Sequence, residues 1–236
     1  MSYFDDLETR SSDERATVLE SSLPKQIATA KTLAGYKTAF TDITAQDITT
    51  LTALSRLPVL RKSDLSKAQS ITSPLGGFTT RQAAGFGHVF QSPGPIYEPG
   101  GIEIDWWRMG RFLHACGIGA GDIVQNCFAY HLTPAGMIFE SGARAVGAAV
   151  LPAGTGQTEL QVRAAVDIGT TAYAGTPDYL KVILDAADAM GEAVKITKAA
   201  VGGGALFPSL RQEYKERGIA CLQCYATADL GNIAYE

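Results

Sequence analysis

The stretch Phe90-Gln91-Ser92-Pro93-Gly94-Pro95-Ile96-Tyr97-Glu98-Pro99-Gly100-Gly101 divides the chain into two parts of different character. Its three prolines and three glycines in twelve residues are incompatible with a helix or a central strand, so we expect a loop. Helices and connectors are predicted before it. After it, short apolar runs alternate with amphipathic helices. A glycine-bearing loop beside an α/β sheet is a common place to hold phosphate.

The second part of the chain predicts five strand–helix units. Such an alternation is typical of a mainly parallel sheet with flanking helices, which makes the fold class α/β. The predicted strands span 123–130, 148–151, 171–174, 199–201 and 219–225, and the predicted helices span 106–116, 134–145, 158–168, 176–190 and 208–217.

The first part predicts a helical N-terminal segment, residues 1–77, ahead of an α/β region, residues 78–236. The run Ser11-Ser12-Asp13-Glu14 predicts a helix start capped by a serine or by the aspartate, and apolar residues continue at helical spacing to Leu33. Pro24 is expected to break this helix in two. One or two strands are predicted between residues 78 and 90.

Composition narrows the class of protein. The 236 residues carry a net charge of −4 without charged blocks, which argues against a nucleic-acid binder and gives no reason to expect a membrane-surface protein. No apolar run approaches the roughly 18 residues needed to span a bilayer. The acidic N-terminus does not resemble a signal peptide, so we expect a cytoplasmic location and four free cysteines.

Ligands of parallel sheets bind outside the carboxyl ends of the strands, so the loops there are the candidates for function. Gly202-Gly203-Gly204-Ala205 follows a strand; its backbone can lie against a planar ring or sugar, or form a plain flexible turn. Tyr225-Ala226-Thr227-Ala228-Asp229 follows the last predicted strand. It can stack a base, bond a phosphate and hold Mg²⁺, or simply end a strand and cap a helix.

Two further motifs have a structural and a functional interpretation. Cys221-Leu222-Gln223-Cys224 is half a zinc site with no second pair nearby, and residues three apart in a strand point to opposite faces, so we interpret it as structural. His131, next to Tyr130, follows a predicted strand and can line a pocket or act as a base. Neither a Ser-His-Asp set nor an HExxH motif can be identified in the sequence.

Together, these segments resemble the phenylacetate–CoA ligase family of adenylate-forming enzymes, in the same order along nearly the whole chain. The run 57–65, LPVLRKSDL, is similar to the family's LP.T.K.DL segment, and 175–180, GTPDYL, is similar to GTPSYal. The turn 119–122 matches GvrpGD, 136–147 matches a glycine-spaced helix, and 151–154 together with 158–159 resembles iPasgg.te.q. Gly202–Ala205 stands where the family has GaEp, and Tyr225–Asp229 where it has YGlsE.

The resemblance implies the N-terminal domain of the adenylate-forming fold and ATP-dependent activation of a carboxylic acid, aryl or aryl-acetic, to acyl-AMP with transfer to CoA. ATP/AMP, Mg²⁺ and CoA are the implied cofactors and a small carboxylic acid the implied partner. By resemblance, Thr227 and Asp229 are catalytic, with Mg²⁺ at Asp229. The other implied site residues are Ser92, Gly94, Gly202, Gly203, Gly204, Ala205, Tyr225 and Ala226 for the nucleotide, and Tyr130, His131, Gly136, Ala153 and Gly154 for the acid.

The phosphate loop departs from the family's SSGTTG pattern. Pro93 and Pro95 lack the N–H groups that bond phosphate, no Lys or Arg lies between Arg81 and Arg108, and Glu98 adds a negative charge. Losing several charge-assisted bonds of about 1.5–3 kcal/mol each would weaken ATP binding severely. Gly204 replaces the glutamate of the adenine loop.

Two alternatives to a ligase therefore remain: a non-catalytic relative that binds AMP or a carboxylic acid, and a structural or partner-binding domain. The family's ribose-binding Asp, hinge and mobile C-terminal domain come later than Glu236, so we expect these residues alone to be inactive. A sheet that ends at Tyr225 would have an open edge, which favours pairing with a second copy, a homodimer.

Overall fold

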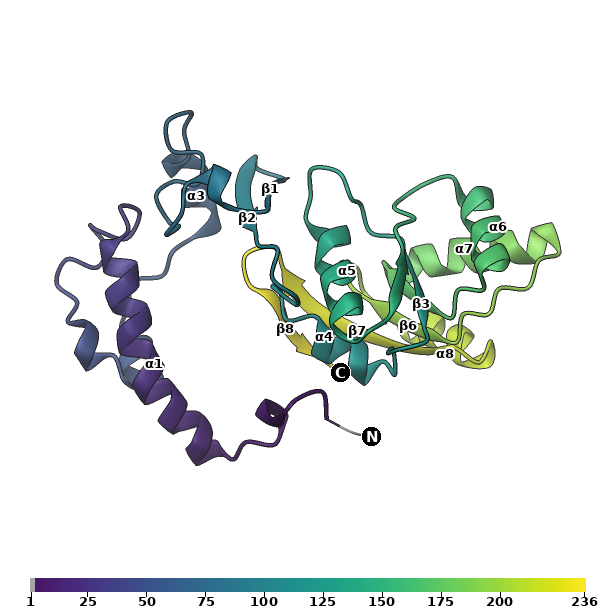
Figure 1. Ribbon diagram of the computed structural model, residues 1–236, viewed down its shortest axis with the longest axis horizontal. Coiled ribbons are helices and arrows are strands. Elements are labelled where there is room, and N and C mark those ends of the chain that lie inside the picture. The colour runs from purple at the N-terminus through teal and green to yellow at the C-terminus, as the bar shows by residue number, and fades with distance from the viewer. Residues whose placement is uncertain (1–2) are drawn as a thin grey trace. The chain divides into compact units, whose positions relative to one another are not determined.

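The computed structural model describes residues 3–236. The chain forms two compact units, Met1–Gly101 and Ile102–Glu236, and each is described by itself (Figure 1). The boundary falls after residue 101, whereas the sequence placed it after residue 77. The residues in between contain a short 3-10 helix and a β-hairpin, which belong to the N-terminal unit.

A long helix, α1 (Ser12–Thr32), dominates the N-terminal unit. The predicted helix start is confirmed, with Ser11 as its cap. The Ser11 side chain accepts a hydrogen bond from the Glu14 N–H while the Glu14 carboxylate accepts one from Ser11 N, which is a capping box. The expected break at Pro24 is wrong, because the proline lies inside one continuous helix. Its second half buries Ile27 and Ala30, and that packing outweighs the lost helical hydrogen bond.

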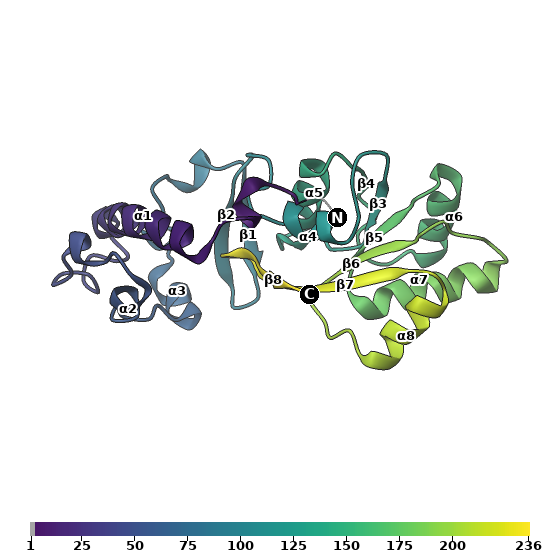
Figure 2. The same ribbon diagram turned by 90° about the horizontal axis from the view of Figure 1, so that it is seen from below.

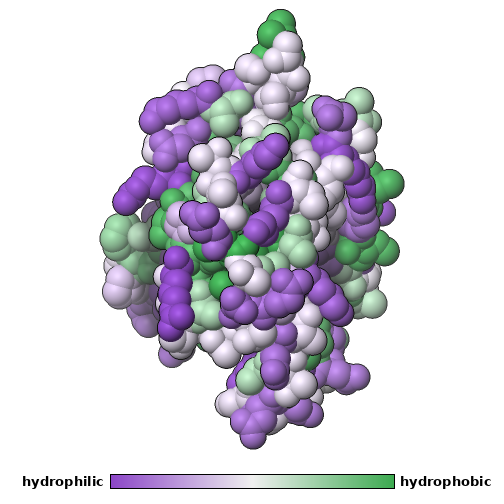
Figure 3. Space-filling view, turned by 90° about the vertical axis from the view of Figure 1, so that its left-hand side faces the viewer, coloured by the Kyte–Doolittle hydropathy of each residue, from purple (hydrophilic) through white to green (hydrophobic). Residues whose placement is uncertain are grey.

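Short elements complete the helical part of this unit: η1 (Asp6–Glu8), η2 (Ala45–Asp47), α2 (Leu51–Leu54), α3 (Lys62–Ala68) and η3 (Ala83–Gly85). Figure 3 shows the surface from the left-hand side of Figure 1. It carries mainly hydrophilic side chains, with hydrophobic ones between them in small groups. The small core of the unit contains Ile27, Ala30, Phe40, Ala45 and Ile48.

The glycine- and proline-rich stretch forms a hairpin of two antiparallel strands, β1 (His88–Ser92) and β2 (Ile96–Gly100), and the prediction of a loop is therefore wrong. The hairpin is a separate two-stranded sheet, so each strand is paired along one edge. Proline is tolerated on an edge strand where its nitrogen faces outward, and Pro99 lies in β2 opposite Val89. The residues 93–95 form the turn.

The C-terminal unit has the predicted α/β fold. Its six-stranded sheet has the order β4-β3-β5-β6-β7-β8, in which every neighbouring pair is parallel except β7 and β8. Strand β3 is shorter than predicted, because the chain leaves the sheet at Asn126 rather than at residue 130. The strands are β3 (Ile123–Asn126), β4 (Ala149–Leu151), β5 (Ala172–Gly175), β6 (Lys198–Val201), β7 (Ala220–Thr227) and β8 (Gly231–Tyr235).

Helices cover both faces of this sheet, as Figure 2 shows for α4 and α5 on one side and α7 and α8 on the other. Phe112 of α4 meets Phe139 of α5 edge to face, and α6 packs on α7 through Val162 and Ile183. The helices are α4 (Gly110–Ala115), α5 (Ala135–Ala145), α6 (Thr158–Ile168), α7 (Pro177–Met190) and α8 (Pro208–Glu216).

Helix α4 begins later than predicted. The carboxylate of Asp105, the expected cap, accepts a hydrogen bond from Gly110 N at 2.8 Å, and the residues 104–107 form a turn ahead of the helix. Asp105 and Arg108 adopt positive φ values of 56° each, so the chain turns sharply here instead of starting a helix.

The open edge expected after Tyr225 is also wrong. Strand β7 continues to Thr227 and turns back into β8, which pairs with it in antiparallel fashion and covers that edge. At the start of β8, Asn232 N donates to Trp107 O at 2.8 Å. No helix within residues 3–236 has the length and apolar character needed to cross a membrane.

Candidate functional site

The loops that follow β3, β4, β5, β6 and β7 all lie at one edge of the sheet, because these five strands are parallel. The chain from β3 crosses by α5 to β4 on one face, whereas the chains from β4 and β5 pass to helices on the other face. Such a change of direction opens a crevice at the carboxyl ends of the strands, which is where open α/β sheets bind ligands.

The glycine loop after β6 lies against the loops of its neighbours. A Cβ placed on Gly203 would lie 3.7 Å from the Phe128 ring and 3.8 Å from Thr176 Cγ2. A Cβ on Gly204 would lie 3.4 Å from Pro177 Cδ. Gly203 also has a φ of +70°, which favours glycine. The structure thus places the segments after β3, β5 and β6 next to one another.

The predicted segments after β6 and β7 start from adjacent strands. Gly202 is buried, and a Cβ on it would lie 3.1 Å from the sulfur of Cys224 in β7. Gly203, Gly204 and Ala205 are exposed. Backbone from this loop is therefore accessible at the edge of the sheet.

Two buried tyrosines fix the Thr176–Pro177 turn. Tyr173 Oη donates to Thr176 O at 2.9 Å, and Tyr214 Oη donates to Pro177 O. Burial raises the pKa of both phenols, which keeps them protonated as hydrogen-bond donors. Gly175 has to be a glycine because a Cβ there would lie 2.1 Å from Tyr173 Oη.

The segment Tyr225–Asp229 projects beyond the end of β6, the strand that precedes the glycine loop. Val201, the last residue of β6, pairs with Gln223, so the last four residues of β7 extend about 13 Å further at about 3.3 Å per residue. Tyr225 is 64% exposed, and Asp229 is exposed after it. Thr227 Oγ accepts a hydrogen bond from Leu230 N at 3.2 Å, which shapes a hairpin turn rather than a helix cap.

Tyr130 and Gly136, two residues expected to line the acid's pocket, lie against each other. A Cβ on Gly136 would lie 2.9 Å from the Tyr130 ring. Asn126 Nδ2 donates to Tyr130 Oη at 2.7 Å and to Gly136 O at 2.8 Å. Burial, with a smaller contribution from Glu140, raises the pKa of Tyr130, so its phenol stays neutral. His131 is exposed after them.

Asn126 therefore belongs to the candidate site, although our reading of the sequence did not single it out. It is fully buried at the end of β3, and its Oδ1 accepts from Phe128 N at 3.2 Å. Two polar residues in succession, Gln125 and Asn126, close an otherwise apolar strand. Buried amides need partners, so that pattern was the available signal.

Ala153 and Gly154 lie in the loop between β4 and α6, as predicted. This loop borders a cleft of about 210 Å³. Gln161 of α6, which the analysis of the sequence also missed as a site residue, is 5% exposed beneath the loop. The cleft is lined by Leu151, Ala153, Thr155, Gly156, Gln157, Leu160, Gln161 and Ala164.

Ser92 and Gly94, the expected phosphate-loop residues, lie at the turn of the β1–β2 hairpin in the N-terminal unit. Ser92 Oγ donates to Glu98 Oε2 at 2.5 Å. Lys62, 36 residues earlier in the chain, donates to the other oxygen of Glu98, whose side chain is 4% exposed. The charge of Glu98 is thus matched by a lysine that is distant in sequence, which corrects the expectation that it only adds negative charge.

The cysteines of the CxxC motif are free and buried in β7. Cys221 packs with residues of α7 and α8, such as Leu184 and Tyr214, whereas Cys224 lies beside Gly202 on the other face. Burial raises the pKa of Cys221 and of Cys224 to about 12. The two thiols thus lie on opposite faces of β7, as the sequence predicts for residues three apart in a strand.

Within residues 3–236, no three or more His, Cys, Asp and Glu side chains gather into a metal-binding cluster. Mg²⁺ is often held by one or two carboxylates together with substrate phosphates, so a single exposed carboxylate such as that of Asp229 fits a site completed by nucleotide.

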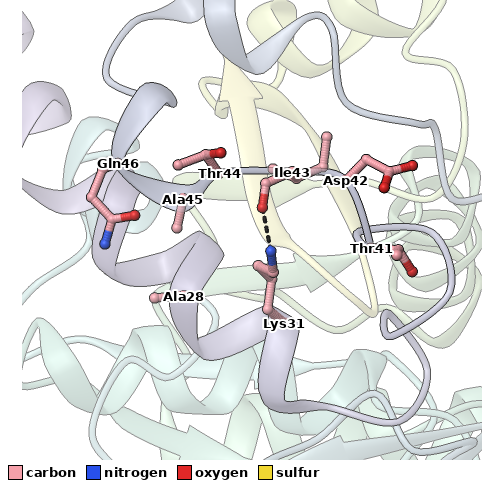
Figure 4. A pocket seen from close by; sticks show the side chains of 8 residues that line it. All are labelled: Ala28, Lys31, Thr41, Asp42, Ile43, Thr44, Ala45 and Gln46. Carbon is pink, nitrogen blue, oxygen red and sulfur yellow. Dashed lines mark hydrogen bonds between the residues drawn. The ribbon is translucent and has the colours of Figure 1, made fainter.

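A second hollow, of about 590 Å³, lies in the N-terminal unit between α1 and the segment that leads into η2 (Figure 4). The Lys31 ammonium donates to the carbonyl of Ile43 across it. Its walls are Ala28, Lys31, Thr41, Asp42, Ile43, Thr44, Ala45 and Gln46.

No protein-family model matches the chain. Two curated relatives are similar in sequence. A phenylacetate–coenzyme A ligase of Aromatoleum evansii is 29% identical over 165 residues, which cover 66% of this chain and 36% of the relative. A phenylacetate–coenzyme A ligase of Pseudomonas putida is 26% identical over 208 residues, which cover 83% of this chain and 46% of the relative. The chain thus spans less than half the length of both.

Solved structures show the same fold. An open form of 2-hydroxyisobutyryl-CoA ligase with 2-HIB-AMP and CoA matches with a TM-score of 0.84 at 19% identity, over 92% of this chain and 51% of that one. Its postadenylation state with 2-HIB-AMP matches with a TM-score of 0.83 at 19% identity, over 93% and 50%. The resemblance in sequence to phenylacetate–CoA ligases is confirmed, and the fold is that of these solved CoA ligases.

Proposed function

We propose that this chain provides the adenylate-binding part of an acid–thiol ligase, which uses ATP to convert a carboxylic acid to acyl-AMP and then transfers the acyl group to CoA. The observation that carries the proposal is the contact of Gly203 and Gly204 with the segments after β3 and β5 at the carboxyl edge of the sheet. The names of the curated relatives support the same reaction class.

In the first step, the carboxylate of the acid attacks the α-phosphorus of ATP and pyrophosphate leaves. The exposed backbone of Gly203 and Gly204 would lie along the adenine, and the exposed ring of Tyr225 would stack on it. The Thr227 hydroxyl would contact the phosphate, and Asp229 would hold Mg²⁺, which neutralises phosphate charge when it is bound. In the second step, the CoA thiolate attacks the acyl carbon and AMP leaves.

The acid in this proposal is an aryl or aryl-acetic acid. The cleft beside Ala153 and Gly154 measures about 210 Å³, and an apolar cavity of about 150 Å³ is enough to bind benzene. Leu151, Leu160 and Ala164 give the cleft apolar walls suited to a ring. The relatives named phenylacetate–coenzyme A ligase agree with this size and polarity.

A second candidate function is binding of AMP or a carboxylic acid without activation. Ser92 Oγ already donates to the buried carboxylate of Glu98, so it is committed within its own hairpin. Pro93 and Pro95 offer no N–H to a phosphate in the same turn. These contacts favour weak binding of the β- and γ-phosphates, whereas AMP binding at the other loops would be unaffected.

Pyrophosphate exchange separates the two candidates. The full-length gene product is assayed with ATP, Mg²⁺ and a panel of acids that includes phenylacetate and benzoate. Exchange above background with any acid supports the ligase and excludes the non-catalytic relative. Absence of exchange, combined with a thermal shift by AMP, supports the binding protein, since a ligand at about 100 times its Kd stabilises by about 2.7 kcal/mol.

We expect residues 1–236 alone to form no thioester, since they span less than half of the named relatives. A cytoplasmic location, and pairing of two copies, also stay proposals. Sedimentation of the purified chain tests the pairing, which would now use the outer edge of β8 rather than β7.

A further inference from the structure

Gln161 lies at the centre of a buried hydrogen-bond network beneath the loop between β4 and α6. Its Nε2 lies 3.0 Å from Gly154 O and 2.8 Å from Gly156 O, with Ala153 O at 3.5 Å. Carbonyls only accept hydrogen bonds, so the amide nitrogen must face the loop. Gly154 and Gly156 have φ values of +66° and +79°, which helps turn these carbonyls toward one side chain.

The oxygen of the Gln161 amide accepts hydrogen bonds from strand β3 and from the residue that follows it. Gln125 Nε2 donates to Gln161 Oε1 at 3.0 Å, and Cys127 Sγ donates to the same oxygen at 3.2 Å. Tyr179 of α7 donates from its hydroxyl to Gly156 O at 3.2 Å. One side chain thus connects strand β3 with the loop, and α7 supports the loop from its outer side.

One buried polar atom of this network has no hydrogen-bond partner among the described residues. Gln125 is fully buried, and its Oε1 lacks a hydrogen-bond partner among the described residues. A buried acceptor without a partner is unfavourable, whereas apolar residues of the same shape in place of both partners can be neutral or stabilising. The buried glutamine pair is therefore better explained by the shape it imposes on the loop than by a contribution to folding.

We infer that Gln161 is a positioning residue, which holds the 153–156 loop in the conformation that binds the carboxylic acid. This inference rests on the proposed function for its ligand, but not for its effect on the loop. If removal of the amide leaves the loop in its binding conformation about one tenth of the time, the apparent Kd for the acid rises about tenfold. Gln161 contacts neither Gly202–Gly204 nor Tyr225–Asp229, so the Kd for AMP should not change.

The test uses the purified chain and the substitutions Gln161→Met and, in a double variant, Gln125→Met with Gln161→Met. Methionine keeps the length of the side chain and removes the amide. Gln212→Met is the matched control, because Gln212 is exposed on α8 and bonds only Glu216 at 2.8 Å. Hydrogen exchange of peptides that cover 153–160, urea midpoints, and calorimetric titrations with phenylacetate and with AMP are measured.

The inference predicts an unchanged or higher urea midpoint for the double variant and faster exchange in 153–160. It also predicts an approximately tenfold weaker binding of phenylacetate with unchanged AMP binding. Equal exchange in parent and variants would overturn it. So would a fall in stability with equal loss of both ligands, which marks a merely structural role. If the parent binds no acid, the proposed substrate fails, while the exchange data still decide whether Gln161 positions the loop.

Discussion

Single residues differ in their contacts between the carboxyl edge of the sheet and the opposite edge. At the carboxyl edge, glycines allow close approach of backbone, as at Gly175 beneath Tyr173 Oη and at Gly203 beside Phe128. At the opposite edge, Asp122 joins three strands: its carboxylate accepts from Lys198 Nζ at 2.7 Å, from Thr171 Oγ at 2.8 Å and from Gly119 N at 2.9 Å. Residues at one edge can thus serve a ligand while those at the other fix the strands.

Asp122→Asn should lower the stability of the C-terminal unit at pH 7 by about 1–3 kcal/mol, the cost of leaving buried donors poorly satisfied. Burial raises the pKa of Asp122, but hydrogen bonds from Lys198, Gly119 and Thr171 outweigh it and leave the pKa below the ordinary 3.8. The folded state therefore favours the charged form, and this stability is present above pH 3.8 and lost as the pH falls through the folded value. Urea titrations should show a difference in unfolding free energy between the parent and the variant that is smaller at pH 3 than at pH 7. An equal difference at both pH values would refute this role.

Gly231→Ala should destabilise the β7–β8 hairpin far more than Gly121→Ala. Both glycines have positive φ, +69° and +92°, so alanine is strained at both. A Cβ on Gly231 would lie 2.2 Å from Trp107 O, whereas one on Gly121 would meet nothing within 4 Å. Thermal melts of the two variants measure the contrast. Equal melting temperatures would mean that the hairpin does not pack on Trp107 as described.

At the scale of elements, β7 consists of a half that lies in the core and a half that projects beyond β6. Its first half lies in the core, and its last residues project past β6 toward the candidate site. The β8 strand pairs with this projecting half from Cys224 to Thr227. The hairpin thus supports Tyr225 and Thr227 where the rest of the sheet does not reach.

The two cysteines of β7 should react with a thiol reagent such as DTNB only after unfolding. Their pKa of about 12 leaves the thiolate fraction at pH 8 on the order of a thousandfold below that of a free cysteine, and burial blocks access as well. Cys116 and Cys127 are buried too. Titration with and without guanidinium checks this. Rapid reaction of any of the four in the native chain would contradict the burial described.

Helices and parallel strands were predictable because caps, glycine stops and apolar periods are local signals. Thr176-Pro177 opens α7, Gly191 ends it, and Gly169 ends α6, as the sequence indicates. The hairpin at 88–100 was not predictable from the sequence. Proline argues against a strand unless the strand has an unpaired edge, and whether an edge is unpaired depends on the tertiary structure. The β8 strand was missed for a related reason: its pairing with β7 is decided by a turn, not by a long apolar run.

For the candidate site too, residues in local motifs could be predicted from the sequence, whereas pairs distant in sequence could not. Gly202–Gly204 and Tyr225–Asp229 were identifiable because each resembles a family motif. Gly202 directly follows β6, whereas Tyr225–Thr227 are the last residues of β7 itself, which continues past the predicted strand end. The Lys62–Glu98 pair, 36 residues apart, and the Gln125–Gln161 pair, also 36 apart, depend on which elements pack together. Short motifs do not carry that information, so these supports appear only in the folded chain.

For the molecule as a whole, we propose that the carboxyl edge of this sheet binds an adenylate. The most direct test is hydrogen exchange of the purified chain with and without saturating AMP. We predict slower exchange in peptides that contain 202–207 and 225–231, and unchanged exchange in peptides at the opposite edge, around Gly119–Asp122. No protection at either loop, or protection confined to peptides away from this edge, would contradict the claim.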